Sequence, residues 1–408
     1  MIKKYELASP KILLGNLNFF RVWLSGFLFG TTRWLEVLAV SIYVLDVTGS
    51  PLMVALTMFL RMLPMFIFGG VVGAFAEIVD GKRLLICGLL TIVAVYGILS
   101  FLSFIQSLQI WQLIIGVFLS GIFWSLELPV RRTMVAEIAG IKNIGTAMGL
   151  DTATNNFTRM LGPFFGGVLY EFFGLHGALI LGAGLYLLSA WLLLFVAYER
   201  HSQPTRKRSV VANMIQGMRY VKTNSVLKSA LGVTIIFNLF GFACVSMVPV
   251  IARQELELSA SGIGIITASE GLGAFFGSIL VAFFGFKKIF YQVYFFGAAL
   301  YLLGLIVFSV STLFWVSFLA LWLGGMGLAG FSSMQAAIII SNAPLQMRTR
   351  LMGVLTMCIG TGPVGILIIG FLANYFGAVS GVFFVSSIGL LSLFISGKVW
   401  PELLRLNR

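Results

Sequence analysis

The stretch "MGLDTATNNFTRMLGPFFGGVLYEFFG", residues 148–174, has a counterpart in "MGVLTMCIGTGPVGILIIGFLANYFG", residues 352–377. Both begin with Met-Gly, contain Gly-Pro, and end with two glycines that are separated by six residues. Met352 follows Met148 by 204 residues, which is half the length of the 408-residue chain. The sequence therefore predicts two halves built on one repeated plan.

The composition indicates a membrane protein. The mean hydropathy is +1.02, 59% of residues are hydrophobic and only 10% are charged, against about 25% charged residues in soluble domains. Apolar runs of roughly 20 residues recur along the chain, and each can cross about 30 Å of hydrocarbon. The runs lack the alternation of barrel strands, so we expect an all-α membrane protein.

Polar segments divide these runs into twelve predicted spans. They are 18–45, 52–75, 84–105, 110–130, 145–170 and 176–197, then 230–252, 261–285, 289–310, 314–340, 352–374 and 378–398. We expect two six-helix halves, 1–198 and 230–408. The segment 199–229 reads as a cytoplasmic linker that contains a short amphipathic helix, because apolar residues recur on one helical face from Val211 to Val221.

Basic residues of the short loops gather on one predicted side of the membrane. They are Lys3, Lys4, Lys11, Lys82, Arg83, Arg131, Arg132, Lys142, the cluster 200–228, Lys287, Lys288, Arg348, Arg350, Lys398, Arg405 and Arg408. The opposite side has essentially Arg253 alone. Since basic loops stay cytoplasmic, both termini are expected there. The net charge of +13 then reflects topology and attraction to anionic headgroups, not nucleic-acid binding.

The sequence offers no sign of a cofactor, a metal site or an enzyme. Cys87, Cys244 and Cys358 lie far apart inside apolar runs, without disulfide or metal spacing. No nucleotide-binding loop, Ser/His pair, paired Asp or HExxH motif is present.

The loop "GAFAEIVDGKRLLI", residues 73–86, resembles the cytoplasmic signature of the major facilitator superfamily. The closest variant is that of drug and siderophore exporters related to macrolide-efflux and enterobactin-export proteins. The matching residues are Gly73, Ala76, Asp80, Lys82, Arg83, Leu84 and Leu85, whereas Glu77 replaces an Asp and Ile78 an Arg. The resemblance implies a conformational latch in which Glu77 pairs with Arg131 or Arg132. A solvated turn is the alternative.

The opening stretch resembles the antiporter signature of the fifth span in such exporters. The matching residues are Gly149, Gly162, Pro163, Gly166 and Gly167, while Thr158 replaces a glycine. The resemblance implies efflux. Small residues let helices approach closely, and Pro163 is expected to bend the span. Ordinary helix packing is the alternative.

Charged side chains within the spans are costly and therefore mark function. They are Arg33, Glu36, Arg61, Glu127, Asp151, Arg159 and Glu270. Asp151, Asn155, Thr158, Arg159 and the glycines of span five fall on one helical face, and Glu270 shares a face with Gly273. Arg33 and Glu36 are one turn apart and can pair.

Three roles are open to these residues: structural ion pairs, substrate contact and proton carriage. The residues assigned to substrate binding are Arg33, Trp34, Arg61, Trp124, Asn155, Arg159 and Glu270. Glu36 and Asp151 are the favoured proton carriers. Glu127 is a further proton-coupling residue or a gate.

The sequence thus predicts a proton-coupled exporter of a small drug-like or siderophore-like amphiphile, monomeric, in a bacterial inner membrane. Alternatives are an importer, a lipid transporter, a metal-ion exporter or a non-transporting receptor on the same fold.

Overall fold

The structure is a computed structural model that describes residues 10–76, 80–140, 143–198, 210–284, 289–344 and 347–403. All regular elements in these ranges are helices. Ten helices of the described residues are long and apolar enough to cross a membrane. A shorter apolar helical run, Pro51–Ile67, adds to them. The chain is therefore an all-helical, multi-pass membrane protein.

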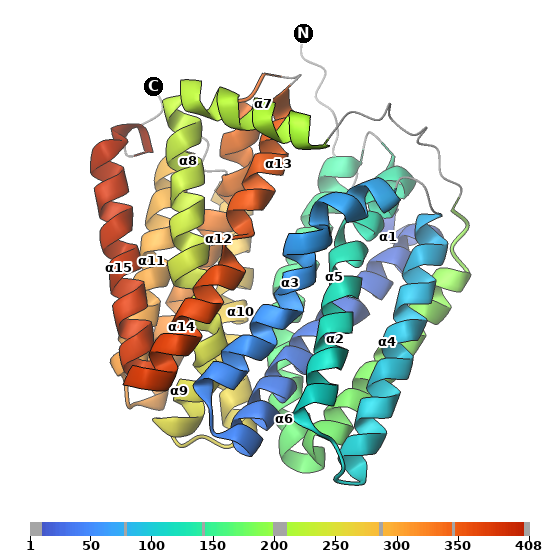
Figure 1. Ribbon diagram of the computed structural model, residues 1–408. Coiled ribbons are helices and arrows are strands. Elements are labelled where there is room, and N and C mark those ends of the chain that lie inside the picture. Colours follow the sequence, from blue (N-terminus) through green and yellow to red (C-terminus); the bar gives the residue numbers. More distant parts are fainter. Residues whose placement is uncertain are drawn as a thin grey trace. The chain divides into compact units, whose positions relative to one another are not determined.

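The chain forms two compact units, and the boundary between them falls inside two helices. One unit comprises Met1–Val40 and Leu60–Arg206, and the other comprises Ser41–Phe59 and Lys207–Arg408. The helices of the first half of the chain are α1 (Pro10–Gly15), α2 (Leu17–Thr48), α3 (Pro51–Ala76), α4 (Gly81–Phe104), α5 (Ile110–Ala139) and α6 (Ile144–Leu194) (Figure 1). Because α2 and α3 cross the boundary, the turn that joins them belongs to the second unit.

The second half of the chain contains more and shorter helical pieces. They are α7 (Val210–Thr223), α8 (Ser225–Ile236), η1 (Phe237–Gly241), η2 (Phe242–Met247), α9 (Val248–Gln254), α10 (Ala260–Phe284), α11 (Phe290–Val310), α12 (Phe314–Ser341), α13 (Arg348–Ile359), α14 (Gly362–Phe376), α15 (Ala378–Val399) and η4 (Pro401–Leu403). The amphipathic helix α7 lies across the ends of α8 and α13 (Figure 1).

Local capping explains where several helices begin and end. Asp80 Oδ1 accepts a hydrogen bond of 3.0 Å from the Lys82 amide at the start of α4. Asn224 Oδ1 likewise accepts from the Leu227 amide, at 3.1 Å, at the start of α8. These contacts satisfy amides that have no partner within the helix. Gly140, with φ of 73°, ends α5 in a conformation that favours glycine.

Helix α6 consists of two antiparallel limbs that meet at Gly174, whose φ of 63° and ψ of −168° are not helical. Contacts with α2 show the reversal. Later residues of α2 meet later residues of the first limb, but they meet earlier residues of the second limb. The pairs are Trp23 with Thr154, Leu35 with Gly166, Ser25 with Ser189 and Thr32 with Gly182. The predicted spans 145–170 and 176–197 correspond to these limbs.

The predicted span 230–252 is not one regular helix. It passes from α8 through a π-helical segment, η1, and a 3-10 segment, η2, into α9. Asn238 donates a side-chain hydrogen bond of 2.9 Å to the carbonyl oxygen of Thr234, and Pro249 has no amide hydrogen to donate. Both features disturb the regular ladder, and π-segments of this kind gather at functional sites.

The two copies of the repeated stretch also differ. Pro163 lies inside the continuous first limb of α6, whereas Pro363 lies in the first turn of α14, after a break that follows α13. At the break, Thr361 Oγ1 donates to the carbonyl oxygen of Cys358 at 2.8 Å. Two glycines, Gly360 and Gly362, flank this threonine and weaken the helix.

Candidate functional site

The spans of the first unit contain a buried group of charged residues that come from α2, α3, α5 and α6. Arg33, Glu36, Arg61, Glu127, Arg131 and Asp151 are all buried. A charged side chain at mid-membrane costs at least about 2.5–3.5 kcal/mol. The contacts of each residue therefore show how the protein offsets that cost.

Glu36 of α2 and Arg61 of α3 form a two-pronged ion pair. Arg61 Nη1 lies 2.7 Å from Glu36 Oε1, and Nη2 donates to Oε2, also at 2.7 Å. Ser120 of α5 donates to Oε2 at 3.3 Å, and its hydroxyl lies 3.1 Å from that of Tyr96. Gly121 allows α5 to reach the backbone of Arg61, because a Cβ there would collide with the Arg61 carbonyl oxygen. Both oxygens of Glu36 are therefore occupied.

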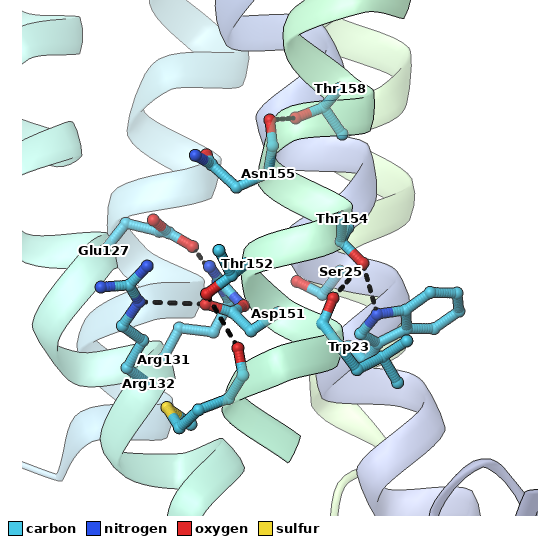
Figure 2. A network of polar contacts seen from close by, with 12 residues as sticks. Trp23, Ser25, Glu127, Arg131, Arg132, Asp151, Thr152, Thr154, Asn155 and Thr158 are labelled. Atoms are coloured by element: carbon cyan, nitrogen blue, oxygen red, sulfur yellow. Dashed lines mark hydrogen bonds and ion pairs between the residues drawn. The ribbon is translucent and has the colours of Figure 1, made fainter. Parts of the chain in front are cut away.

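Arg131 of α5 bridges two carboxylates, as Figure 2 shows. Its Nε pairs with Glu127 Oε1 one turn away, and its Nη1 pairs with Asp151 Oδ1 on α6. Arg132 Nε pairs with the second oxygen of Asp151 at 3.0 Å. Asp151 is thus held by two guanidinium groups. Glu127 is 3% exposed, and its Oε2 has no hydrogen-bond partner among the described residues.

The direct contacts of Arg33 of α2 that the structure describes are with uncharged groups. It is 5% exposed, and its Nη2 donates to Asn155 Oδ1 on α6 at 2.9 Å. Its Cζ lies 4.8 Å from the ring centroid of Trp124, 5.2 Å from Trp34 and 5.8 Å from Phe29. Such cation–π contacts offset part of the burial cost. Among the described residues, Arg33 Nε has no hydrogen-bond partner.

A small cavity lies between Arg33 and the Arg131 network within the first unit. Its walls are formed by Gly26, Phe29, Gly30, Arg33, Glu127, Leu128, Arg131, Asp151, Thr154, Asn155 and Thr158. About 10 Å³ is open to the centre of a water molecule, which is roughly the space of one water. Asp151, Asn155 and Thr158, which fall on one predicted face of span five, thus line one cavity.

Trp34 of α2 packs against Arg33 and against Arg159 of span five. The Arg159 guanidinium lies 4.9 Å from the centroid of the Trp34 ring, on which Arg33 also packs. Within the described part of the chain, the buried indole Nε1 of Trp34 has no acceptor. Two guanidinium groups therefore share one aromatic ring.

Two motif glycines place the first limb of α6 directly on the backbone of α2. A Cβ at Gly162 would lie 2.8 Å from the Thr31 carbonyl oxygen, and one at Gly166 would lie 2.6 Å from that of Leu35. Pro163 and Gly167 are buried beside them. Gly149, by contrast, has open space around it. Close backbone approach thus explains part of the motif, but not Gly149.

The second unit holds a separate polar region. Glu270 of α10 is buried, and Tyr301 donates to its Oε1 at 3.4 Å. The glycines on the same face, Gly273 and Gly277, meet the backbone of α12. Elsewhere in this unit Gln335 donates to Thr234 at 3.0 Å.

The predicted latch is only partly described. Glu77 lies outside the described residues, and no side-chain contacts are described for Gly73 and Ala76. Asp80 caps α4, Arg83 Nε lies 3.4 Å from Asp80 Oδ2, and Lys82 Nζ donates to the carbonyl oxygens of Leu194 and Val196 at 2.9 and 2.8 Å. Arg131 and Arg132 meet Asp151.

Sequence reasoning missed several partners and mispaired one. Glu36 pairs with Arg61, not with Arg33. Ser120, Tyr96 and Gly26 were not singled out, although a hydroxyl or a glycine within an apolar span is a usual sign of helix contact. Arg33, Trp34, Trp124, Asn155 and Arg159 lie together in the first unit, whereas Glu270 lies in the second.

The fold and the buried charges define a polytopic membrane transporter. The family described as transmembrane secretion effector, MFS_3, matches residues 10–400. The chain belongs to this family of the major facilitator superfamily, whose members are transporters and not enzymes.

Two relatives and one solved structure illustrate the similarity. The chain is 25% identical over 319 residues to "Uncharacterized MFS-type transporter YfiS" of Bacillus subtilis (76% of this chain, 71% of that protein). It is 20% identical over 273 residues to "Macrolide efflux protein A" of Streptococcus pyogenes (66% and 67%). A crystal structure of a POT family transporter in complex with a thioalcohol-conjugated peptide has a TM-score of 0.80 at 12% identity, covering 95% of this chain and 96% of that one.

Proposed function

We propose that the protein is a proton-coupled secondary exporter of a small amphipathic molecule, drug-like or siderophore-like, that works by alternating access in a bacterial inner membrane. Twelve spans follow if α3 crosses the membrane and each limb of α6 crosses once. Both termini are then cytoplasmic. The six-helix halves are 1–198 and 230–408, with 199–229 as the linker, and the protein acts as a monomer.

The buried carboxylate of Glu127 is the observation that supports proton coupling most strongly. One of its oxygens meets Arg131, and the other is buried without a hydrogen-bond partner among the described residues. A proton can occupy this second oxygen without breaking an existing contact with a described residue. We therefore assign the proton to Glu127.

Glu36 and Asp151 fit a structural role better than the proton-carrying role that the sequence favoured. Both oxygens of each carboxylate meet guanidinium groups. Protonating either residue would weaken two charge-assisted contacts, and protonating Glu36 would also leave the buried Arg61 without its counter-charge. Their task is then to hold α2 to α3 and α5 to α6.

The similarity to an efflux protein supports the outward direction. The glycines at 162 and 166, which let α6 pack on α2, also fit the antiporter signature. Arg33, Trp34, Trp124, Asn155 and Arg159 are assigned to substrate contact within the first unit, and Glu270 within the second. Arg61 is reassigned to the ion pair with Glu36.

Transport into everted membrane vesicles tests the proposal. An acidic interior is imposed, and the proton leak caused by erythromycin, naphthoate or dihydroxybenzoate is followed with a pH-sensitive dye. At least one compound is expected to release protons only from vesicles that contain the protein. Compound movement that does not respond to the pH gradient would contradict proton coupling.

A further inference from the structure

Arg33 provides a positive charge without a negative partner in direct contact among the described residues. Its hydrogen-bond partner is an amide oxygen, and its other neighbours are the rings of Phe29, Trp34 and Trp124. The other two fully buried arginines of the first unit, Arg61 and Arg131, each meet at least one carboxylate. Arg33 is therefore the exception within this set.

Two buried donors near this charge are unused. Arg33 Nε and Trp34 Nε1 have no hydrogen-bond partner in the part of the chain that the structure describes. Arg33 Cζ lies 5.2 Å from the Trp34 ring, so both donors belong to one neighbourhood. A buried donor without an acceptor costs about 1–3 kcal/mol, and more when the group is charged. A ligand that supplies acceptors would recover this energy.

The cavity beside Arg33 suits a small oxygen-bearing group. Its lining includes Arg33, Asn155 and Thr158 and, on the side of Arg131, the carboxylates of Glu127 and Asp151, and its open volume of about 10 Å³ accepts one water-sized group. The remainder of a ligand must therefore lie outside this cavity. A carboxylate matches the guanidinium fork in shape and in charge.

We propose that the transported molecule is an acidic aromatic amphiphile whose carboxylate binds Arg33. This inference rests on the proposed function and adds the substrate class to it. The carboxylate gives Arg33 a negative charge in direct contact, which no described residue provides, and it accepts from Arg33 Nε and Trp34 Nε1. The aromatic part of the substrate packs on the rings of Trp34 and Trp124, for which flat apolar groups are suitable partners.

A cationic substrate fits the same region less well, because its charge would meet Arg33 within the cavity that the guanidinium lines. Two described carboxylates line the cavity: Asp151 already pairs with Arg131 and Arg132, whereas Glu127 Oε2, which has no hydrogen-bond partner among the described residues, would attract an ammonium group. If Glu127 binds the proton, however, this oxygen is neutralised when the proton is bound. Binding of an amine is therefore the competing outcome of the test.

The test compares three ligands that share one ring system and differ in charge: naphthoate, naphthamide and naphthylmethylamine. Their affinity for the purified full-length protein in detergent is measured by thermal shift and by quenching of tryptophan fluorescence. Naphthoate is expected to bind about tenfold more tightly than naphthamide, since a hydrogen bond to a charged group is roughly twice as strong as one to a neutral group. The amine is expected to bind most weakly.

Variants of Arg33 and Trp34 then test whether these two residues cause the preference for naphthoate over naphthamide. Arg33→Gln should bring the two affinities within about twofold, and Arg33→Lys should keep part of the preference because the charge remains. Trp34→Phe keeps the ring but loses Nε1, so it should weaken naphthoate binding about threefold and naphthamide binding by less, because the amide oxygen is the weaker acceptor. Arg219→Gln, at an exposed arginine of α7, is the matched control and should match the native protein.

Each outcome bears on the proposal. Equal binding of acid and amide by the native protein, tighter binding of the amine, or an unchanged preference in Arg33→Gln would overturn it. Should Arg33→Gln not fold, the Arg33→Lys and Trp34→Phe results decide the question in the same way. Failure of the proposed function is a separate result, namely that vesicles move no compound of any charge in response to a pH gradient.

Discussion

Gly26 of α2 leaves the space in which the guanidinium group of Arg131 lies. A Cβ at position 26 would be 2.6 Å from Arg131 Nη1 and 2.7 Å from Cζ. Arg131 in turn meets Glu127 on its own helix and Asp151 on α6. A glycine in one span therefore determines the position of a charged network between two others.

The alanine variant of Gly26 tests this relationship. Because the displaced group is the end of a flexible side chain, Gly26→Ala should shift Arg131 and weaken its ion pairs without unfolding the bundle. We expect at least tenfold slower gradient-driven transport and a small loss in melting temperature, since alanine by itself favours a helix by about 0.5–1 kcal/mol. The rates are measured in proteoliposomes. Gly97→Ala is the control, because Gly97 in α4 has no neighbour within 4 Å and should transport normally.

Substituting alanine for Gly162 or Gly166 should destabilise the folded protein. A Cβ at either position meets a backbone carbonyl oxygen of α2, which cannot move without shifting the helix. We expect each variant to lower the free energy of unfolding by about 1–3 kcal/mol, the usual cost of overpacking. Gly149→Ala should be neutral or stabilising, since the space there is open. Equal thermal stability of all three variants would mean that α6 does not pack on α2 in this way.

Removing one partner of the Glu36–Arg61 pair should destabilise the protein more than removing both. Glu36→Gln leaves the buried Arg61 without its counter-charge, a change that costs about 3–5 kcal/mol. Adding Arg61→Gln should restore part of the loss, because two neutral amides can hydrogen-bond to each other. A double-mutant cycle in thermal unfolding measures the coupling.

Asp46 and Arg253 provide the contrast to that buried pair. Asp46 Oδ1 lies 3.1 Å from Arg253 Nη2, and their side chains are 28% and 37% exposed. Pairs of this exposure contribute about 0–1 kcal/mol. Asp46→Asn should therefore change stability by less than about 1 kcal/mol. A loss as large as that of Glu36→Gln would show that exposure does not account for the difference.

A double-mutant cycle of Glu77 and Arg132, measured by transport, tests the latch proposal. If Glu77 pairs with a basic residue of α5, Arg132 is the better partner, because Arg131 already meets two carboxylates whereas the Arg132 side chain is 42% exposed. Transport by Glu77→Arg with Arg132→Glu should exceed that of either single variant. Additive losses in the cycle would remove the latch.

Several predicted spans agree with the helices of the structure, because the apolar runs that define them are local features of the sequence. Span 378–398 corresponds to α15 (Ala378–Val399), and span 289–310 to α11 (Phe290–Val310). The irregular segments η1 and η2 were not predicted, because they depend on how a side chain such as Asn238 competes with the helix ladder. Composition alone carries no information on that competition.

The pairing of charges was harder to predict for a similar reason. Arg33 and Glu36 are neighbours on one helix, but Glu36 finds a better partner in Arg61 on the next helix. Helical geometry did identify the face with Asp151, Asn155 and Thr158, since that face depends on residue spacing alone. That Glu127 Oε2 has no hydrogen-bond partner among the described residues follows only from the packing of α5 and α6.

The most direct test of proton coupling is the transport behaviour of Glu127→Gln. In everted vesicles with an acidic interior, the account predicts that this variant no longer accumulates a transported compound. It should still exchange labelled for unlabelled compound at a rate close to that of the native protein. Gradient-driven accumulation that survives in Glu127→Gln at the native level would contradict the assignment of the proton to Glu127.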